Sequence, residues 1–399
     1  MIGGDDGLKR RLGLGLLTAY GVGVMVGAGI YVLIGAMVGA AGVWAPLSFV
    51  IAAGIAGLSA LSYAELSSRI PEAAGAAAFV DQGLRRTWLG VAVGVAIAVA
   101  GVVSAAAVLR GGAGYLVSIL DLPLSAVIVV MGAALVAVAV IGVLESLTLT
   151  AIFTGVELFG LCLVVWAGAV ARPVPDWTAP AGIVWPGLGL ATILAFYAFV
   201  GFEDIANMAE EAIRPERTLP RAILLSIAIT AVIYAGVSLA AVRAVPHARL
   251  AESEQPLALV WVAGSGQNPA ILSAIAVAAA LNGVLAQIIM AARVLYGLGR
   301  RAPALAMFHQ AHPRFGTPVR ATLLLGTIVI VSALTLPVSA LVGATSSVLL
   351  TVFALVNLSL IAMKRRAPFA AFRVPVFVPW LGLITALAAL GFSLAGVGA

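Results

Sequence analysis

The chain has 399 residues, of which 63% are hydrophobic and only 10% are charged. Soluble domains carry about 25% charged residues on average, so this composition excludes an ordinary water-soluble protein. The net charge of +6 comes from short basic clusters between apolar runs rather than from a basic tail, and we therefore expect no nucleic-acid partner.

Apolar runs of roughly 20 residues recur along the whole chain, and each is long enough to cross a ~30 Å hydrocarbon core as a helix. Ala, Leu, Val and Gly dominate these runs, as in packed membrane helices, whereas a β-barrel would show short alternating segments. The sequence predicts an all-α polytopic membrane protein, a single integral membrane domain over 1–399 in contact with lipid. Its eleven predicted spans are 12–41, 44–68, 88–118, 124–143, 148–171, 185–212, 218–243, 269–298, 319–336, 338–363 and 374–396.

The basic residues predict the orientation of these spans. With the N-terminus in the cytoplasm, all but four of the 22 Lys and Arg fall in or beside cytoplasmic segments, the four being Arg110, Arg172, Arg243 and Arg249. We therefore expect a multi-pass protein of the cell membrane with a cytoplasmic N-terminus. The stretch 244–268 is too polar to span and is interpreted as an extracytoplasmic loop with room for a short surface helix.

The first span holds a glycine cluster near its middle, with the sequence GVGVMVGAGI at 21–30. Glycine costs about 1 kcal/mol relative to alanine inside a helix, so the cluster favours a local break at mid-membrane. A broken backbone at that depth is tolerated only where it lines a cavity or meets other polar groups. The alternative is that Gly23 and Gly27 simply allow a neighbouring helix to pack closely.

The sixth span contains a similar interruption, with the sequence FYAFVGFEDI at 196–205. Gly201 lies at mid-span, and Glu203 and Asp204 follow it. Ionisable groups at that depth are costly unless they face a wet or polar interior. The alternative is an early exit of the helix from the membrane, although this leaves the rest of the apolar stretch unexplained.

Interrupted helices at corresponding places in two halves indicate the binding site of a secondary transporter. We expect 12–171 and 185–363 to form two five-helix repeats, inverted because five is an odd number, with 374–396 as an additional helix. A half-helix that begins near Ala28 presents free N–H groups and a positive dipole end, which suit a carboxylate. The carbonyls of Met25 and of 197–200 can accept hydrogen bonds from an ammonium. Such a site fits a zwitterion without any charged side chain.

Four blocks in order carry a resemblance that covers nearly the whole chain. They are Gly21 to Ile34; YAELSSRIPEAAGA at 63–76; FVGFED at 199–204 followed by AEEAIRPERTLPR at 209–221; and ARVLYGLGR at 292–300 followed by His312-Pro and Thr317-Pro. At these residues the sequence resembles the amino acid–polyamine–organocation superfamily, specifically its cationic-amino-acid-transporter-like and basic amino acid permease members.

The resemblance implies a five-plus-five inverted-repeat fold, shared with sodium-coupled amine and amino acid symporters, in which the first and sixth helices are broken. It also implies that the carboxylate binds at Gly27, Ala28 and Gly29. The amine would bind to carbonyls of Met25, Tyr197 and Val200, with Phe202 as an aromatic gate. Family members usually have twelve or more helices, whereas eleven are predicted here.

Glu157 is the candidate coupling residue. Several proton-coupled relatives carry a lysine at the aligned position, so a carboxylate here reverses the charge. A buried carboxyl is costly to ionise, and Glu157 could take up a proton or coordinate a cation between the first, fifth and eighth helices. The alternative is a protonated or hydrogen-bonded structural glutamate. Glu203 and Asn282 are the other coupling candidates, although either could instead satisfy a helix terminus or a neighbouring helix.

The sequence therefore predicts a secondary active transporter of amino acids or related amines that works by alternating access and is proton-coupled or exchanging. The alternatives are a substrate-gated, channel-like membrane protein and a polyamine or organic amine carrier. No catalytic motif appears, and the histidines share no metal-ligand spacing, so we expect neither an enzyme nor a cofactor beyond a coupling proton or cation. Small predicted walls at Ala105, Ala106 and Ala198 favour neutral amino acids. The oligomeric state is not predicted.

Overall fold

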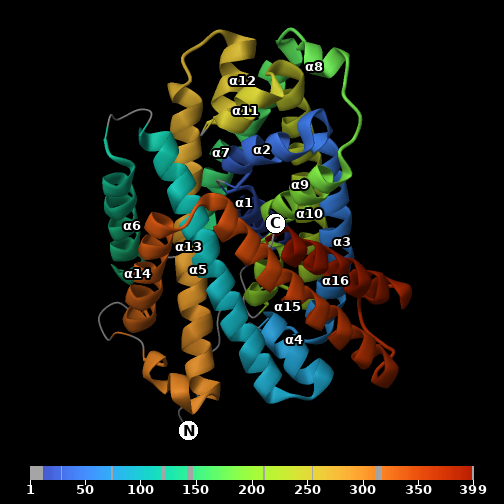
Figure 1. The fold of residues 1–399 in the computed structure, drawn as a ribbon. Helices are drawn as coiled ribbons and strands as arrows, with labels where there is room; N and C mark the ends of the chain where they lie inside the picture. Colours follow the sequence, from blue (N-terminus) through green and yellow to red (C-terminus); the bar gives the residue numbers. More distant parts are fainter. Residues whose placement is uncertain are drawn as a thin grey trace.

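The computed structural model describes residues 12–27, 29–72, 75–117, 122–141, 147–209, 212–253, 255–310, 312 and 317–397. Within these ranges the chain forms helices and no β-strand (Figure 1). The elements of the first half are α1 (Leu14–Val26), α2 (Gly29–Ala41), η1 (Gly42–Trp44), α3 (Ala45–Arg69), α4 (Gly75–Leu84), α5 (Thr87–Val117), α6 (Leu124–Ile141), α7 (Leu147–Val170) and α8 (Pro175–Thr178). Those of the second half are α9 (Trp185–Ala198), η2 (Phe202–Met208), α10 (Pro215–Ala244), α11 (His247–Glu252), α12 (Pro256–Ser265), α13 (Ala270–Arg301), η3 (Pro303–Phe308), α14 (Val319–Thr335), α15 (Val338–Arg366) and α16 (Phe377–Val397).

The predicted all-α membrane architecture is confirmed. In the described part of the chain, ten helical stretches are long and apolar enough to cross a membrane. The remaining predicted span, 319–336, corresponds to α14, a helix of 17 residues. The first and sixth predicted spans each contain two elements, α1 with α2 and α9 with η2.

The described residues of the stretch 244–268 include no helix long enough to span, as predicted, but they form two helices where a loop with one short surface helix was expected. Residues 247–252 form α11 and residues 256–265 form α12, and Leu257 and Val260 of α12 are fully buried. An apolar run of ten residues is too short to span a bilayer, but it can be buried against the protein, here mainly against α7. The helix α4 is also ten residues long and was not predicted, for the same reason.

The long helices α5 and α13 pack against each other through the middle of the bundle, with α6 and α14 on one flank and α15 and α16 on the other (Figure 1). The helices α1 and α2 lie inside, where α1 contacts α7 and α10 and α2 contacts α9 and α11. The short helices α8, α11 and α12 lie at one end of the bundle and α4 at the other. Each break therefore lies within the bundle and away from its outer surface.

Hydrogen bonds join α8 to α11 at the end of the bundle where α8, α11 and α12 lie. The Asp176 carboxylate accepts a hydrogen bond from the backbone N–H of His247 at 3.1 Å, and its Oδ2 lies 2.6 Å from Nδ1 of the same histidine. The hydrogen bond from that backbone N–H holds the pKa of Asp176 below its usual value. The helix α8 lies in the segment between α7 and α9, and α11 packs on α2. The hydrogen bonds between Asp176 and His247 therefore join that segment to α2, the helix that follows the first break.

An ion cluster joins α3, α15 and the start of α16 near the opposite end. The fully buried Glu65 carboxylate lies 2.6 Å from Arg69 Nη2 and 2.6 Å from Lys364 Nζ, and it accepts a hydrogen bond from the Val374 N–H at 2.8 Å.

Arg110 also has a definite partner. Arg110 Nη1 donates a hydrogen bond to the Ala333 carbonyl at 2.7 Å, near the end of α14. A cationic side chain at a helix C-terminus satisfies a free carbonyl and complements the helix dipole.

Close packing of α7 on α10 depends on a glycine. A Cβ added at Gly168 would lie 2.6 Å from the Ala240 Cα and 2.7 Å from its carbonyl oxygen, which are backbone atoms that cannot rotate away. At Gly155, in the same helix, an added Cβ meets nothing within 4 Å. The two glycines therefore form a matched pair, one at a helix contact and one at an open surface.

We predict that Gly168→Ala destabilises the protein by about 1–3 kcal/mol, because the added methyl overpacks the α7–α10 contact. Gly155→Ala should be neutral or slightly stabilising, since alanine is the better helix former and has room there. Thermal unfolding of the two purified variants in detergent measures the difference. Equal melting temperatures would contradict the close packing described here.

Candidate functional site

The first helix is interrupted at Gly27. This residue has φ +22° and ψ −163°, and its N–H still donates to the Gly23 carbonyl at 3.2 Å. Such a conformation is readily available to glycine and strained for residues with a side chain. The helix resumes as α2 at Gly29, and Ala28, predicted to bind the carboxylate, lies outside the described residues. The predicted break in the first span is confirmed.

The second break follows Ala198, the last residue of α9. The next two N–H groups, those of Phe199 and Val200, donate to carbonyls three residues earlier at 3.0 Å, which tightens the last turn. Gly201 then adopts φ +121°, and the chain continues as η2 from Phe202. The break predicted in the sixth span is likewise confirmed.

The two breaks lie against each other. A Cβ added at Gly201 would lie 2.6 Å from Val24 Cγ1 and 3.3 Å from the Met25 nitrogen, so the backbone of the second break packs directly on the last turn of α1. Glycine is therefore needed at position 201 for two reasons: its positive φ, and the close contact with α1 that leaves no room for a side chain. Residues far apart in the sequence thus form one site.

A single hydroxyl connects both breaks. The Tyr234 hydroxyl, from α10, lies 2.6 Å from the Met25 carbonyl oxygen and 3.0 Å from the Ala198 carbonyl oxygen. Its ring is fully buried and packs on Phe49 and Phe199, with ring centroids 5.4 Å away in each case. The hydroxyl therefore supplies a donor at the point where both helices leave carbonyls without their usual partners.

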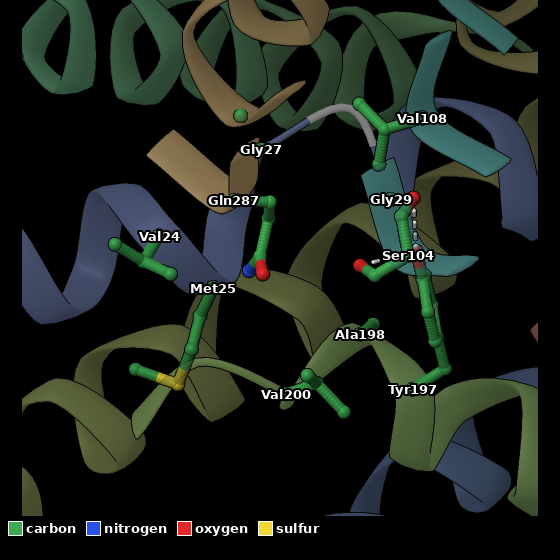
Figure 2. Close-up of a pocket in the computed structure, with 11 residues that line it drawn as sticks. Val24, Met25, Gly27, Gly29, Ser104, Val108, Tyr197, Ala198, Val200 and Gln287 are labelled. Carbon is green, nitrogen blue, oxygen red and sulfur yellow. Dashed lines mark hydrogen bonds between the residues drawn. The ribbon is translucent and has the colours of Figure 1, made fainter. Parts of the chain in front are cut away.

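A cavity lies beside the breaks (Figure 2). It encloses about 360 Å³ of space between atoms, including the part open to solvent. The walls come from α1, α2, α5, α9, α13 and the two breaks, and no wall residue carries a charged side chain. These residues are Val24, Met25, Gly27, Gly29, Ser104, Val108, Tyr197, Ala198, Val200, Gly283 and Gln287. A second, apolar space of about 180 Å³ adjoins Gly29, Val108 and Tyr197 and reaches α15.

The polar side chains of the cavity come from three helices. The hydroxyls of Ser104 and Tyr197 lie 2.9 Å apart, and the Tyr197 hydroxyl also donates to the Ser104 carbonyl at 3.2 Å. Gln287, from α13, points its amide into the space between Met25 and Ser104 (Figure 2). Ser104 and Gln287, like Tyr234 beside the cavity, were not recognised from the sequence. The available signal was an isolated polar residue in an apolar run, as Gln287 is within 283–292.

The predicted substrate-binding residues fall into two groups. Met25, Gly27, Gly29, Tyr197 and Val200 all line the cavity, as does the predicted wall residue Ala198. The predicted walls Ala105 and Ala106 do not line it, because the helix presents the neighbouring Ser104 instead.

Phe202, predicted as a gate, is not among the lining residues. It is fully buried against Tyr63 and Phe353, with ring centroids at 5.5 Å and 5.1 Å. In this arrangement its ring belongs to an aromatic cluster between η2, α3 and α15.

Glu157 and Asn282, two of the three predicted coupling residues, lie in contact. Glu157, from α7, is fully buried, and its Oε1 accepts a hydrogen bond from Asn282 Nδ2 at 3.2 Å. Its Oε2 has no hydrogen-bond partner, and the carboxyl forms no ion pair with a described residue. The Tyr31 hydroxyl donates to the Glu157 backbone carbonyl at 3.1 Å. A buried carboxyl with one free oxygen is suited to hold a proton or a cation.

Glu203 occupies a different position from the other coupling candidates. Its Oε2 accepts a hydrogen bond from the Gly201 N–H at 2.9 Å, so the side chain turns back on the second break and stabilises it. The next residue, Asp204, is also buried, and no described residue forms a hydrogen bond with its Oδ1. This geometry matches the structural alternative for Glu203, a pairing with a helix terminus.

Two abutting helix breaks beside a cavity are the arrangement found at the binding sites of secondary transporters. A family model described as "Amino acid permease" matches residues 12–398. An uncharacterized transporter of Mycobacterium tuberculosis is 31% identical over 328 residues, which cover 81% of this chain and 73% of that protein. The branched-chain amino acid permease BcaP of Bacillus subtilis is 27% identical over 419 residues, which cover 96% of this chain and 88% of that protein. Cationic amino acid transporter 4 of Homo sapiens is 30% identical over 80% of this chain and 54% of its own length.

The chain belongs to the amino acid permease family. The resemblance to the amino acid–polyamine–organocation superfamily is thereby confirmed, with cationic amino acid transporters among the relatives. The chain is a multi-pass membrane protein of a transporter family, consistent with secondary amino acid transport.

We predict that Tyr234→Phe raises the KM for substrate about tenfold, because two carbonyls at the breaks lose their shared donor and shift. Tyr115→Phe is the matched control. Its hydroxyl also donates to a buried helix carbonyl, that of Tyr31, at 2.6 Å, and Tyr115 is not among the residues that line the cavity. Uptake measured against substrate concentration for both variants tests the role, and the same KM in both would contradict it.

Proposed function

We propose that this chain is a secondary carrier of neutral amino acids whose zwitterionic backbone binds at the two helix breaks. The observation that carries the proposal is the cavity itself, which is lined by the peptide groups of both breaks and by no charged side chain. A cationic or anionic substrate side chain would lack a counter-charge in this cavity. A zwitterion needs none, because the peptide groups can serve both of its charges.

The substrate carboxylate is proposed to bind at Gly27 and Gly29, with Ala28 between them. The first N–H groups of a helix have no partner within the helix, and they lie at its positive dipole end. At α2 this end faces the cavity through Gly29. Glycine at this position brings the backbone close to the ligand.

The substrate ammonium is proposed to bind carbonyls on the opposite side of the cavity. The carbonyl of Val200 accepts no hydrogen bond from another described residue, which leaves it free for a ligand. Among the described residues, Tyr234 donates to the Met25 carbonyl, and a carbonyl oxygen has a second lone pair. The Tyr197 carbonyl, which accepts from the Val200 N–H, can contribute in the same way.

The proposed transport cycle is alternating access between two inverted halves, 12–171 and 185–363, with 374–396 outside the repeat. The distribution of Lys and Arg supports a cytoplasmic N-terminus in the cell membrane. Transport, and no chemical reaction or cofactor, is the proposed activity. A channel would more often assemble its filter from several subunits, whereas both breaks here lie in one chain.

The test is uptake of a panel of labelled amino acids into proteoliposomes that contain the purified protein. A carrier gives saturable uptake, and unlabelled substrate inside the vesicles stimulates it. Flux that does not saturate and is not stimulated by internal substrate would establish a channel. Uptake of putrescine or other amines without any amino acid would establish the amine carrier.

Glu157 is proposed to couple transport to a proton. Its free Oε2 and its contact with Asn282 place one ionisable group at the junction of α7 and α13, near α1. A proton would neutralise the carboxyl in its buried position. A bound monovalent cation is the alternative that the same free oxygen supports.

We predict that uptake by the wild-type protein rises as the external pH falls and that Glu157→Gln makes uptake independent of pH, because the amide cannot exchange a proton. Glu216→Gln, at the exposed start of α10, should keep the wild-type pH profile. Uptake is measured across imposed pH gradients at fixed substrate. An unchanged profile in Glu157→Gln would exclude the proton role, and dependence on sodium or potassium instead of pH would establish the cation.

A further inference from the structure

Gln287 is a buried amide without a hydrogen-bond partner in the wall of the cavity. Gln287 is 7% exposed, and it lines the cavity. No hydrogen bond joins its side chain to another residue in the described part of the chain, and its amide is accessible from the cavity. An amide that faces a cavity offers its donor and acceptor to water or to a polar group of a bound ligand.

The other two polar side chains of the cavity have partners within the chain. Ser104 and Tyr197 pair with each other, and Tyr197 also uses the Ser104 carbonyl. The backbone groups at the breaks are the proposed partners of the substrate carboxylate and ammonium. Gln287 is therefore the polar group left for the remaining part of the substrate, its side chain.

The space around Gln287 is kept open by small residues. A Cβ added at Gly101 of α5 would lie 3.2 Å from Gln287 Oε1, so glycine there gives the amide its position. Gly283 lies one turn before Gln287 on α13. A Cβ added at Gly283 would lie 3.8 Å from the Cα of Gly27. The amide thus lies one helical turn from the first break, at a distance suited to the side chain of a bound amino acid.

We propose that Gln287 determines specificity and that the preferred substrate is a neutral amino acid whose side chain carries a hydroxyl or a carboxamide. This inference rests on the proposed function, because it takes the backbone of the substrate to be held at the breaks. An amide offers both a donor and an acceptor, and it matches a hydroxyl or another amide. An apolar side chain of the same size would leave the Gln287 amide unpaired, which is the strongest form of discrimination between isosteres.

The alternative location for the substrate side chain is the apolar space beside Gly29, Val108 and Tyr197. A substrate side chain that entered this space would be aliphatic and would not contact Gln287. A water molecule would then satisfy the amide. The two arrangements give opposite preferences between threonine and valine, which have nearly the same shape.

The test measures uptake of threonine, valine, serine and alanine by the full-length protein in proteoliposomes, each as kcat/KM. The wild-type protein should favour threonine over valine, and serine over alanine, by at least fivefold. Gln287→Met keeps the length of the side chain but removes both hydrogen-bonding groups, and it should bring both ratios close to one. Gly101→Ala, which displaces the amide, should lower the ratios in the same direction, and adding it to Gln287→Met should change them no further.

Each outcome decides the inference. A wild-type preference for valine over threonine would overturn it, as would ratios that Gln287→Met leaves unchanged while uptake of all four substrates falls by the same factor. In both cases neutral amino acids would still be transported, so the proposed function would survive. Failure of the wild-type protein to take up any amino acid would instead remove the proposed function, and the specificity inference with it.

Discussion

The need to satisfy peptide groups inside a membrane is the constraint on which this structure depends. In hydrocarbon each unpaired N–H or C=O costs several kcal/mol, so a broken helix must find partners within the protein or in a ligand. Here the two breaks are placed together and share partners. Tyr234 donates to both, and Glu203 accepts from the N–H of Gly201. What these side chains leave unpaired, such as the carbonyl of Val200, is what a zwitterion can use.

Those shared partners also join three helices. Because one hydroxyl of α10 contacts the ends of α1 and α9, these elements are linked at the cavity and not only along their surfaces. Gly201 extends the same contact through backbone packing on Val24. The proposed alternating access moves the helices that hold the substrate, and these contacts join the two breaks that would take part in it.

The two breaks could be predicted from the sequence because their signals are local. The glycines of 21–30 and Gly201 interrupt apolar runs that are otherwise long enough to span, and the structure has breaks at both places. The roles of Tyr234 and Gln287 could not be predicted in this way, since each depends on which face of its helix meets the breaks. The helix α12 was missed because an apolar run of ten residues is too short to be recognised as a membrane span. Its burial depends on packing against other helices, which the sequence does not show.

The candidate coupling site shows a further limit of prediction from the sequence, because the sequence does not reveal the contacts of a buried carboxyl group. Glu157 could be picked out from the sequence as a carboxylate in an apolar span. Its partner Asn282 is far away in the chain, and only the fold brings the two within hydrogen-bonding distance. Glu203, equally conspicuous in the sequence, points back to its own backbone. Two buried glutamates with similar sequence signals thus have different surroundings.

The central claim is that the peptide groups of the breaks bind both charged ends of an amino acid. Competition against uptake of the best labelled substrate tests this most directly, with three unlabelled competitors: the amino acid, its methyl ester and the corresponding acid without the amino group. The account predicts that removing either charged end weakens competition at least tenfold, because one break then loses its ligand. Equal competition by the ester or by the deaminated acid would contradict it.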